Sequence, residues 1–443
     1  MCHSVVSTFS WNTIYSTALL ARPSWRILHG WYLKIENKEV DYIFLVVGKI
    51  FTIKPLKVKT GGNMKKIIST LGILSLAAGA CLALNTANSF SPVATATAAG
   101  KPTYSGTLYV AGMGGHFSVA DVTINPNNEQ APITVNSVDM LDIGGATHPT
   151  HDARIDDKDR NTMYWSTYKL DNWKNKEEKG GNLHVGKSNL KTGEVIADVA
   201  FPPPERAGWT GANYCASGQT ATSYIPVSMA NEGYIDVFDK GTMQLKHRVF
   251  LDDLGIKAGE TTFAHGINTP DMKKFLLTVN DTPEGFTKWT GNTRLIYLDM
   301  AALEQGKTVK LAEALITGKP KDAEGGTITF RQYFTPDGKY LLQSGADRGY
   351  LIDAETLKVL DEITPLPGEN HDIIPTPDGK YAVMTLREKA KDFEGNDSVD
   401  GTILLYDIEG RKTVGNSASV CFACHKGEGI GKAILCGLDA NWK

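Results

Sequence analysis

Residues 421–425 have the sequence CFACH. Two cysteines separated by two residues and followed directly by a histidine have the spacing of a c-type haem attachment site. Cys421 and Cys424 would form thioethers to one haem, and His425 would be the axial ligand of its iron. A half zinc site is the alternative, but it would require a second Cys/His pair nearby, and only Cys436 is close. We therefore predict one covalently attached haem c.

The residues after this motif provide no second ligand for the iron. Residues 426–443 contain neither methionine nor histidine. We therefore expect residues 416–443 to be a short haem-binding tail rather than a self-standing cytochrome domain. The sixth ligand would then be Met113, His116 or Met140, a residue of a partner protein, or water at an open position.

Three segments typical of a secretory signal follow Met64. Two lysines come first, residues 67–84 are apolar, and residues 91–100 are small and rich in Ala and Thr. This order of basic, apolar and small residues is that of a signal peptide. We predict that residues 64–99 are the signal, and that the mature protein is periplasmic or otherwise extracytoplasmic, where bacterial haem attachment takes place.

Met64 would be the translation start of a chain that begins with a signal peptide. Residues 1–63 precede it, and a signal peptide is expected at the N-terminus of a protein. Gly61, Gly62 and Asn63, directly before Met64, are what a translated ribosome-binding sequence would encode. We interpret residues 1–63 as a mis-called N-terminal extension, and a real extension is the alternative. Cys81 follows a weak lipobox, so lipid anchoring at Cys81 is an alternative to its loss with the signal.

The composition is that of an ordinary globular protein, with 42% hydrophobic and 21% charged residues. A formal charge of −3 favours neither nucleic acid nor an anionic membrane as a partner. We expect no transmembrane span in the mature chain. The many short apolar runs and 44 glycines favour β structure.

Residues 100–415 contain a repeat. Residues 334–342 match residues 375–383, and each segment is a Pro-Asp-Gly turn followed by an apolar strand. Weaker copies lie upstream, giving units of roughly 40–55 residues with about four strands each, which is typical of β-propeller blades. We count six units, and seven blades or a β-sandwich are the alternatives. The first unit lacks its opening strand, so a strand from elsewhere in the chain would close the ring and remove its free edges.

These repeats resemble the YVTN-type propellers, and a propeller joined to a c-type haem is similar to the dissimilatory nitrite reductases. Those enzymes carry the haem c domain before the propeller, whereas this chain carries the motif after it. The resemblance implies a second cofactor on one face of the propeller, held by histidine. In the nitrite reductases it is a specialised haem, and on the similar scaffolds of nitrous oxide reductase and thiocyanate dehydrogenase it is a copper cluster.

Several histidines occupy equivalent places in the repeat, at the entry to the innermost strand of a blade. Residues far apart in sequence at such places are neighbours at one mouth of the central channel. The predicted catalytic set is His116, His151, His265 and His371, with Cys215 and Arg331 at equivalent positions of other units. Imidazoles suit copper, iron or zinc, and neutral histidine can also act as a general acid or base without metal. Asp152 and Asp372 could orient the rings, and packing of isolated core histidines is the plainer alternative.

Together these patterns predict an exported c-type cytochrome that moves electrons between its haem and a redox site on the propeller. It would then be an oxidoreductase of a small molecule with a redox partner protein. The alternative is a non-catalytic electron-transfer subunit whose propeller docks a partner, and a haem-based gas sensor is a third. Copper or a second haem in the propeller would distinguish the enzyme from the carrier.

Overall fold

The computed structural model describes residues 100–443 except 113, 176–179, 208–213, 229–232, 258–262, 284–287, 323–324, 392–395 and 422–434. Before residue 100 it describes only the backbone of four short strands. The chain divides into two units, Met1–Thr97 and Ala98–Lys443. In the first unit, β1 (Ile14–Leu19) pairs antiparallel with β2 (Leu28–Leu33), and β3 (Leu45–Val47) pairs with β4 (Ile50–Thr52). The predicted signal at residues 64–99, with Cys81, lies outside the described residues and stays a prediction.

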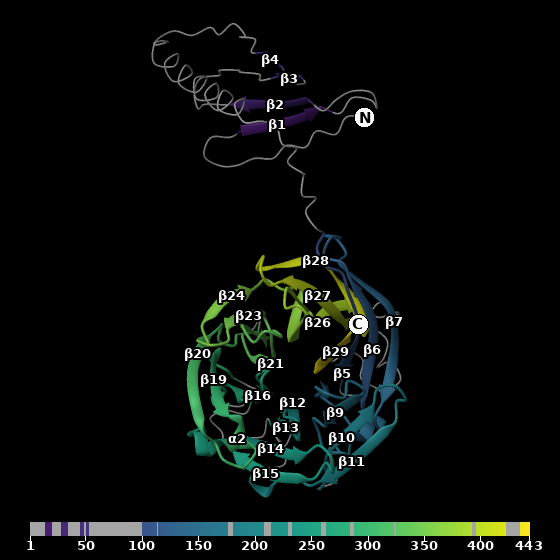
Figure 1. Ribbon diagram of the computed structural model, residues 1–443, viewed down its shortest axis with the longest axis vertical. Coiled ribbons are helices and arrows are strands. Elements are labelled where there is room, and N and C mark those ends of the chain that lie inside the picture. The colour runs from purple at the N-terminus through teal and green to yellow at the C-terminus, as the bar shows by residue number, and fades with distance from the viewer. Residues whose placement is uncertain are drawn as a thin grey trace, which may run out of the picture. The chain divides into compact units, whose positions relative to one another are not determined.

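In its described part, the second unit is a six-bladed β-propeller, as the repeat predicts, in which each blade is a four-stranded antiparallel sheet (Figure 1). Blade 1 contains, from the axis outward, β29 (Leu438–Trp442), β5 (Tyr104–Ala111), β6 (His116–Ile124) and β7 (Ile133–Asp142). Blade 2 contains β8 (Arg154–Ile155), β9 (Thr162–Ser166), β10 (Leu183–Asn189) and β11 (Val195–Phe201). Blade 3 contains β12 (Tyr214–Gln219), β13 (Ser223–Ser228), β14 (Tyr234–Asp239) and β15 (Leu245–Phe250).

Blade 4 contains β16 (Phe263–Asn268), β17 (Lys274–Asn280), β19 (Asn292–Asp299) and β20 (Lys310–Thr317). Blade 5 contains β21 (Thr329–Phe334), β22 (Tyr340–Gly345), β23 (Arg348–Asp353) and β24 (Val359–Ile363). Blade 6 contains β25 (Gly368–Pro375), β26 (Tyr381–Lys391), β27 (Asp397–Asp407) and β28 (Lys412–Cys421). The described helices are short: α2 (Met300–Leu303) and the 3-10 turns η1 (Gly145–Thr147), η2 (Glu205–Ala207) and η3 (Leu251–Leu254).

The burial pattern follows the distance of a strand from the axis. Every residue of β12, β13 and β21 is buried, because both faces of an inner strand pack against the neighbouring blades. On the outer strands β7, β11 and β20, most residues are exposed or only partly buried. The inner strands therefore contribute to several buried hydrophobic clusters, within which a polar side chain needs a partner.

The predicted Pro-Asp-Gly turns connect the first and second strands of blades 5 and 6. In blade 5, the backbone N–H of Gly338 donates to Thr335 O at 2.8 Å, and Gly338 has a φ of 70°. That left-handed conformation favours glycine. Asp337 Oδ1 accepts from the Lys339 N–H at 3.0 Å and closes the turn. These contacts explain why the turn is the clearest sequence signal of the repeat.

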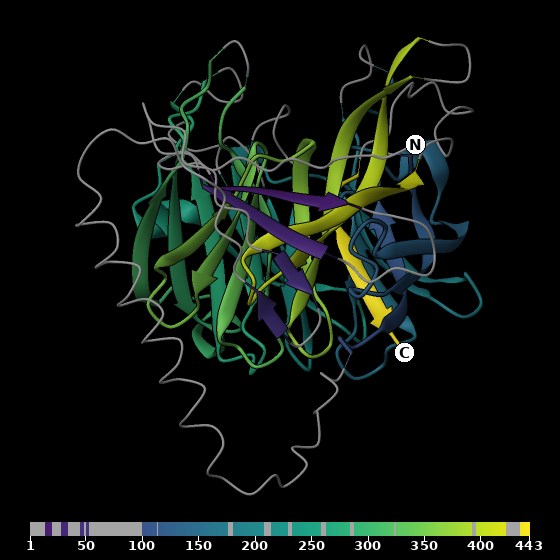
Figure 2. The ribbon, with the colours of Figure 1, turned by 90° about the horizontal axis from the view of Figure 1, so that it is seen from above.

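The last strand of the chain closes the ring. β29 pairs antiparallel with β5, from Leu438 opposite Val110 to Trp442 opposite Gly106, and so supplies the missing inner strand of blade 1. The predicted tail, residues 416–443, is therefore not a separate unit: β28 crosses its first boundary, and residues 438–442 belong to blade 1. The segment that contains the CFACH motif connects blade 6 to blade 1. Figure 2 shows β29 beside the other strands of the propeller.

Candidate functional site

Each blade places one polar or sulfur-containing side chain at an equivalent position of its innermost strand or just before it. From blade 1 to blade 6 these are Cys436, His151, Cys215, His265, Arg331 and His371. All six are buried, with 5% or less of each residue exposed. Three of the four predicted histidines are thus brought together with Cys215 and Arg331, as the repeat positions indicate.

Imidazoles and a thiol meet directly near the axis. His151 Nδ1 lies 2.8 Å from Cys215 Sγ, and His265 Nε2 lies 3.0 Å from the same sulfur. One ligand atom from each of His151, Cys215 and His371 lies within 4.8 Å of the others. We refer to His151, Cys215, His265 and His371 as the central cluster. Histidine nitrogen and cysteine sulfur are the donors that copper and zinc prefer.

Burial sets the protonation state of the central cluster. It lowers the pKa of His151, His265 and His371 well below the usual histidine value, with further lowering by neighbouring arginines. The imidazoles are therefore neutral at pH 7, and each offers a nitrogen lone pair. Burial also raises the pKa of the Cys215 thiol well above its usual range. Without a metal Cys215 is a thiol, and metal binding would release its proton.

A buried ion-pair network surrounds the cluster. Arg331 Nη1 lies 2.8 Å from Asp152 Oδ1, and Arg331 Nε lies 3.1 Å from Asp372 Oδ1. Tyr224 also donates to Asp152 Oδ2 at 2.5 Å. Asp372 contacts His371 Nδ1 at 2.9 Å, so it orients that ring. Asp152 pairs with Arg331 rather than with an imidazole. Burial raises the pKa of Asp372 to about 7, although Arg331 opposes that rise.

Aromatic rings hold the imidazoles in place. Phe330 stacks on His371 with ring centroids 4.4 Å apart, and Tyr168 stacks on His151 at 4.1 Å. His265 Nδ1 is buried and has no hydrogen-bond partner in the described part of the chain. A buried polar atom without a partner is costly, so this atom fits a site that gains a ligand.

His116 lies elsewhere. It is the first residue of β6, the third strand outward in blade 1, where it is buried and pairs with Asp142 of β7. It is thus not part of the set on the innermost strands. The sequence suggests a loop between two strands of the first unit at His116, and such a loop could reach the mouth of the channel, so His116 was predicted with the catalytic set.

Cys436 is a member of the ring that the sequence did not place there. It stands directly before β29, and Arg387 Nη2 donates to its sulfur at 3.1 Å. Burial raises the pKa of the Cys436 thiol to about 12. Cys215 and Cys436 are both free thiols. Recognition of residues 438–442 as the missing inner strand would have revealed this position.

The haem motif is only partly described. Cys421 ends β28, is 4% exposed, and its sulfur is in a disulfide bond. Cys424 and His425 lie outside the described residues, so the haem prediction rests on sequence alone. A thioether at Cys421 would require that thiol to be reduced. Of the predicted distal ligands, Met140 is 55% exposed on β7, and residue 113 is not described.

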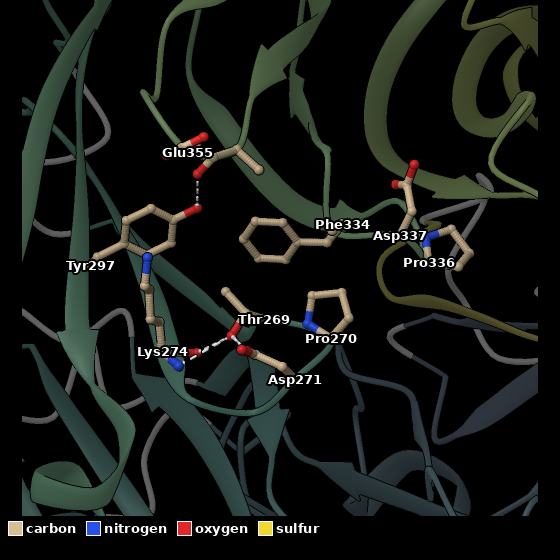
Figure 3. Close-up of a pocket in the computed structure, with 11 residues that line it drawn as sticks. Thr269, Pro270, Asp271, Lys274, Tyr297, Phe334, Pro336, Asp337 and Glu355 are labelled. Atoms are coloured by element: carbon tan, nitrogen blue, oxygen red, sulfur yellow. Dashed lines mark hydrogen bonds between the residues drawn. The ribbon is translucent and has the colours of Figure 1, made fainter.

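A cleft of about 630 Å³ lies away from the central cluster, between the turns of blades 4 and 5 (Figure 3). Pro270, Tyr297 and Phe334 point into it, and Lys274 Nζ lies 5.0 Å from the centroid of the Tyr297 ring. No residue of the central cluster lines this cleft. The cleft is therefore a feature separate from the central cluster.

Comparisons with known proteins add little to the fold. No family model and no curated protein matches the sequence. A chain in a nidogen–laminin complex is 13% identical over 76% of this chain and 98% of that chain, with a TM-score of 0.45. Hydrazine synthase from Kuenenia stuttgartiensis is 14% identical over 68% of this chain and 76% of that chain, with a TM-score of 0.39. Similarity at this level carries no argument about function.

Among the described residues, no helix is long and apolar enough to cross a bilayer.

Proposed function

We propose that the protein is an extracytoplasmic redox protein in which the central cluster binds a copper ion and a haem c attached at Cys421 and Cys424 is a second redox centre. It would act as an oxidoreductase on a small molecule and exchange electrons with a partner protein. The observation that carries this proposal is the convergence of two imidazole nitrogens, within 3.0 Å, on the sulfur of Cys215.

The donors and their surroundings suit copper. Two imidazoles and a thiolate are a ligand set that copper accepts in electron-transfer proteins, and His371 provides a third imidazole in the same space. Asp372 holds the His371 ring, which is the role that carboxylates take behind metal-bound histidines. Arg331 lowers the pKa of the cluster histidines, but its charge is offset by contacts with Asp152 and Asp372, which reduces its opposition to a bound cation. A bound copper ion would supply one-electron redox chemistry.

The haem part of the proposal rests on the CFACH sequence, with His425 as the axial ligand. The topology is compatible with electron exchange between the two centres. The chain leaves the motif segment at Leu435, whose carbonyl accepts from Arg387 at 3.0 Å, and Cys436 then joins the ring of side chains near the axis. The motif segment is therefore anchored beside the central cluster at its end.

A second candidate is the electron-transfer subunit that docks a partner. The observation in its favour is a row of exposed apolar side chains on and before the outer strand β20, where Val309, Leu311 and Leu315 are 45%, 49% and 61% exposed. Exposed apolar rows of this kind occur at protein contacts. In this case the histidines of the central cluster would be packing residues, and no metal would accompany the haem.

Metal and haem content separates the two candidates. The chain would be purified from an exporting, haem-attaching host, and iron, copper and zinc per polypeptide would be measured together with covalently bound haem. We expect one iron and one copper. Cys215→Ser should lose copper and keep the haem, whereas Cys421→Ala with Cys424→Ala should lose the haem and keep copper. His247→Ala, outside both sites, is the control. One iron without copper would contradict the copper site, and zinc that is lost in Cys215→Ser would show a redox-inactive metal in the central cluster.

A further inference from the structure

A second group of metal-ligating side chains lies in blade 2, outside the central cluster. His148 Nε2 lies 2.9 Å from Asp198 Oδ2, and His184 Nδ1 lies 2.8 Å from Asp198 Oδ1. The two imidazole centroids are 4.2 Å apart, and one ligand atom from each of these residues lies within 4.8 Å of the others. The residues come from three segments: the stretch after η1, the strand β10 and the strand β11. The proposed redox function does not use them.

The hydrogen bonds of His148 determine which ring nitrogen carries a lone pair. Thr147 Oγ1 lies 3.0 Å from Gly144 O and 2.8 Å from His148 Nδ1. When the hydroxyl donates to Gly144 O, it accepts from His148 Nδ1. In a neutral ring, Nε2 then has no hydrogen. It nevertheless faces a carboxylate oxygen of Asp198 at 2.9 Å. Two acceptors this close require a cation between them, either a proton or a metal ion.

His184 also faces carboxylate oxygens with both of its ring nitrogens. Its Nδ1 faces Asp198, and its Nε2 lies 3.5 Å from Asp171 Oδ2. A neutral imidazole has one N–H, so one of its nitrogens must face a carboxylate without a hydrogen. Nε2 makes no hydrogen bond at this distance. If Nε2 carries the hydrogen, Nδ1 is left for a cation shared with His148 and Asp198. A carboxylate behind a metal-bound histidine is the usual way in which proteins fix such a ring.

The charges of the group are not balanced by basic side chains. In the part of the chain that the structure describes, the ion pairs of Asp171 and Asp198 are with these histidines, and neither carboxylate pairs with lysine or arginine. The two carboxylates therefore leave negative charge in the group that no basic side chain offsets. A divalent cation would balance that charge.

We propose that His148, His184 and Asp198 bind a zinc ion and that Asp171 orients His184. Zinc takes histidine nitrogen and aspartate oxygen at about 2.0–2.1 Å, and three protein ligands leave one position for water or a ligand. Tetrahedral bonds of that length place the donors roughly 3.3 Å apart, so the present pairs would separate by a few tenths of an ångström. Asp198 is 34% exposed, and the open position would face that side.

The backbone before His148 is built for this ring position. Gly144 has a φ of 138°, and a Cβ at Gly144 would lie 2.1 Å from His148 Nδ1. Only glycine therefore fits beside the ring. Trp165 packs against the same ring at 5.8 Å between centroids. Because Gly144 and Trp165 already hold the His148 ring, its side chain would lose little conformational entropy on binding a metal ion.

The test is titration of metal-free, full-length Cys215→Ser protein with Zn²⁺ by calorimetry and with Co²⁺ by visible absorption. The substitution removes the thiol of the central cluster, and His151→Ala with His371→Ala in the same chain removes two of its imidazoles. Metal bound by the central cluster is thus told apart from metal bound in blade 2. We expect one equivalent of either metal to bind, with Co²⁺ bands that lack sulfur charge transfer. In this background, His148→Ala, His184→Ala and Asp198→Asn should abolish binding, Asp171→Asn should weaken it roughly 10- to 100-fold, and His247→Ala should leave it unchanged.

Two outcomes would overturn the proposal. The first is the absence of Zn²⁺ binding by the folded Cys215→Ser chain, which would mean that protons alone bridge these residues. The second is binding that survives His148→Ala and Asp198→Asn. Circular dichroism and thermal melting of each variant show that it is folded, and Asp198→Asn retains the shape of the side chain. Failure of the copper proposal would not affect either result.

Discussion

At the scale of single residues, Arg331 is the most constrained side chain near the axis. It is 1% exposed, and its guanidinium lies between Asp152 and Asp372, both of them fully buried. A charge in a low-dielectric interior is tolerated only when it is paired and hydrogen-bonded. The same arginine also donates to His151 O at 3.4 Å and to Ala153 O at 3.2 Å. It therefore joins blades 2, 5 and 6 through one side chain.

Removal of this guanidinium should destabilise the fold strongly. Arg331→Met leaves two buried carboxylates without their cation, and breaking a buried pair in this way costs about 3–5 kcal/mol. Chemical denaturation followed by circular dichroism would measure the loss in free energy of unfolding. Arg294→Ala is the matched control, because it removes a partly exposed pair with Glu313 and should cost less than about 1 kcal/mol. Equal effects of the two changes would contradict the argument.

At the scale of elements, the network around Lys240 connects blade 2 to blade 3. Lys240 Nζ contacts Asp156 Oδ2 and Gln219 Oε1, each at 2.7 Å. Asp156 directly follows β8 of blade 2. In blade 3, Gln219 is the last residue of β12, and Lys240 directly follows β14. Burial alone would raise the pKa of Asp156, but hydrogen bonds from Lys240 and two backbone N–H groups lower it below the usual aspartate value. The folded chain therefore binds this proton less tightly than the unfolded chain does.

This lowered pKa predicts a pH-dependent effect of Asp156→Asn. A depressed carboxyl pKa adds stability at pH values above the unfolded pKa of about 3.9, and that stability disappears as the pH falls through and below it. At pH 7 the substitution should lower the free energy of unfolding by about 1–3 kcal/mol. Towards pH 3 the difference from the wild type should shrink, because the unfolded chain then binds more of this proton. Urea denaturation at both pH values measures it, and a pH-independent difference would contradict the assignment.

The elements that could be predicted are those with a local signal. Pro-Asp-Gly turns such as Asp337-Gly338 require specific residues, so they repeat visibly and reveal the blades. The closing strand β29 has no such turn, and its identity depends on a pairing with residues over 300 positions away. Cys436 was missed for the same reason. His148 and His184 occupy unlike places, one in a loop and one on β10, so no repeat position linked them.

At the scale of the whole molecule, the ring depends on one short strand at its end. β29 protects the edge of β5 and completes blade 1 against blades 2 and 6. A chain ending at residue 437 would expose β5 as an unpaired edge, which invites association between copies. We expect this truncation to lower the melting temperature and to give oligomers in size-exclusion chromatography. Lys443→Ala, which keeps β29, should elute as the wild type does, and a truncated chain that also does so would show that the closure is dispensable.

The CFACH motif precedes the closing strand β29 in the chain. Closure of the propeller ring could therefore depend on the proposed haem attachment. The contacts that close blade 1 belong to the protein alone: β29 pairs with β5, Ala111 N donates to Gly437 O at 2.7 Å, and Cys436 N donates to Ala111 O at 2.8 Å. Leu438 and Ala440 are buried in the same core. The contacts named here all lie outside residues 422–434.

We therefore expect Cys421→Ala with Cys424→Ala to abolish covalent haem while the propeller still closes. The variant should elute as the wild type does, with an unchanged far-ultraviolet circular dichroism spectrum and a melting temperature within a few degrees of the wild type, because the hydrogen bonds and apolar burial of β29 are retained. Leu438→Ala is the contrasting change, since it leaves the motif intact but should cost about 2–4 kcal/mol in the core. If the cysteine variant unfolds while Leu438→Ala does not, haem attachment rather than strand pairing closes the ring.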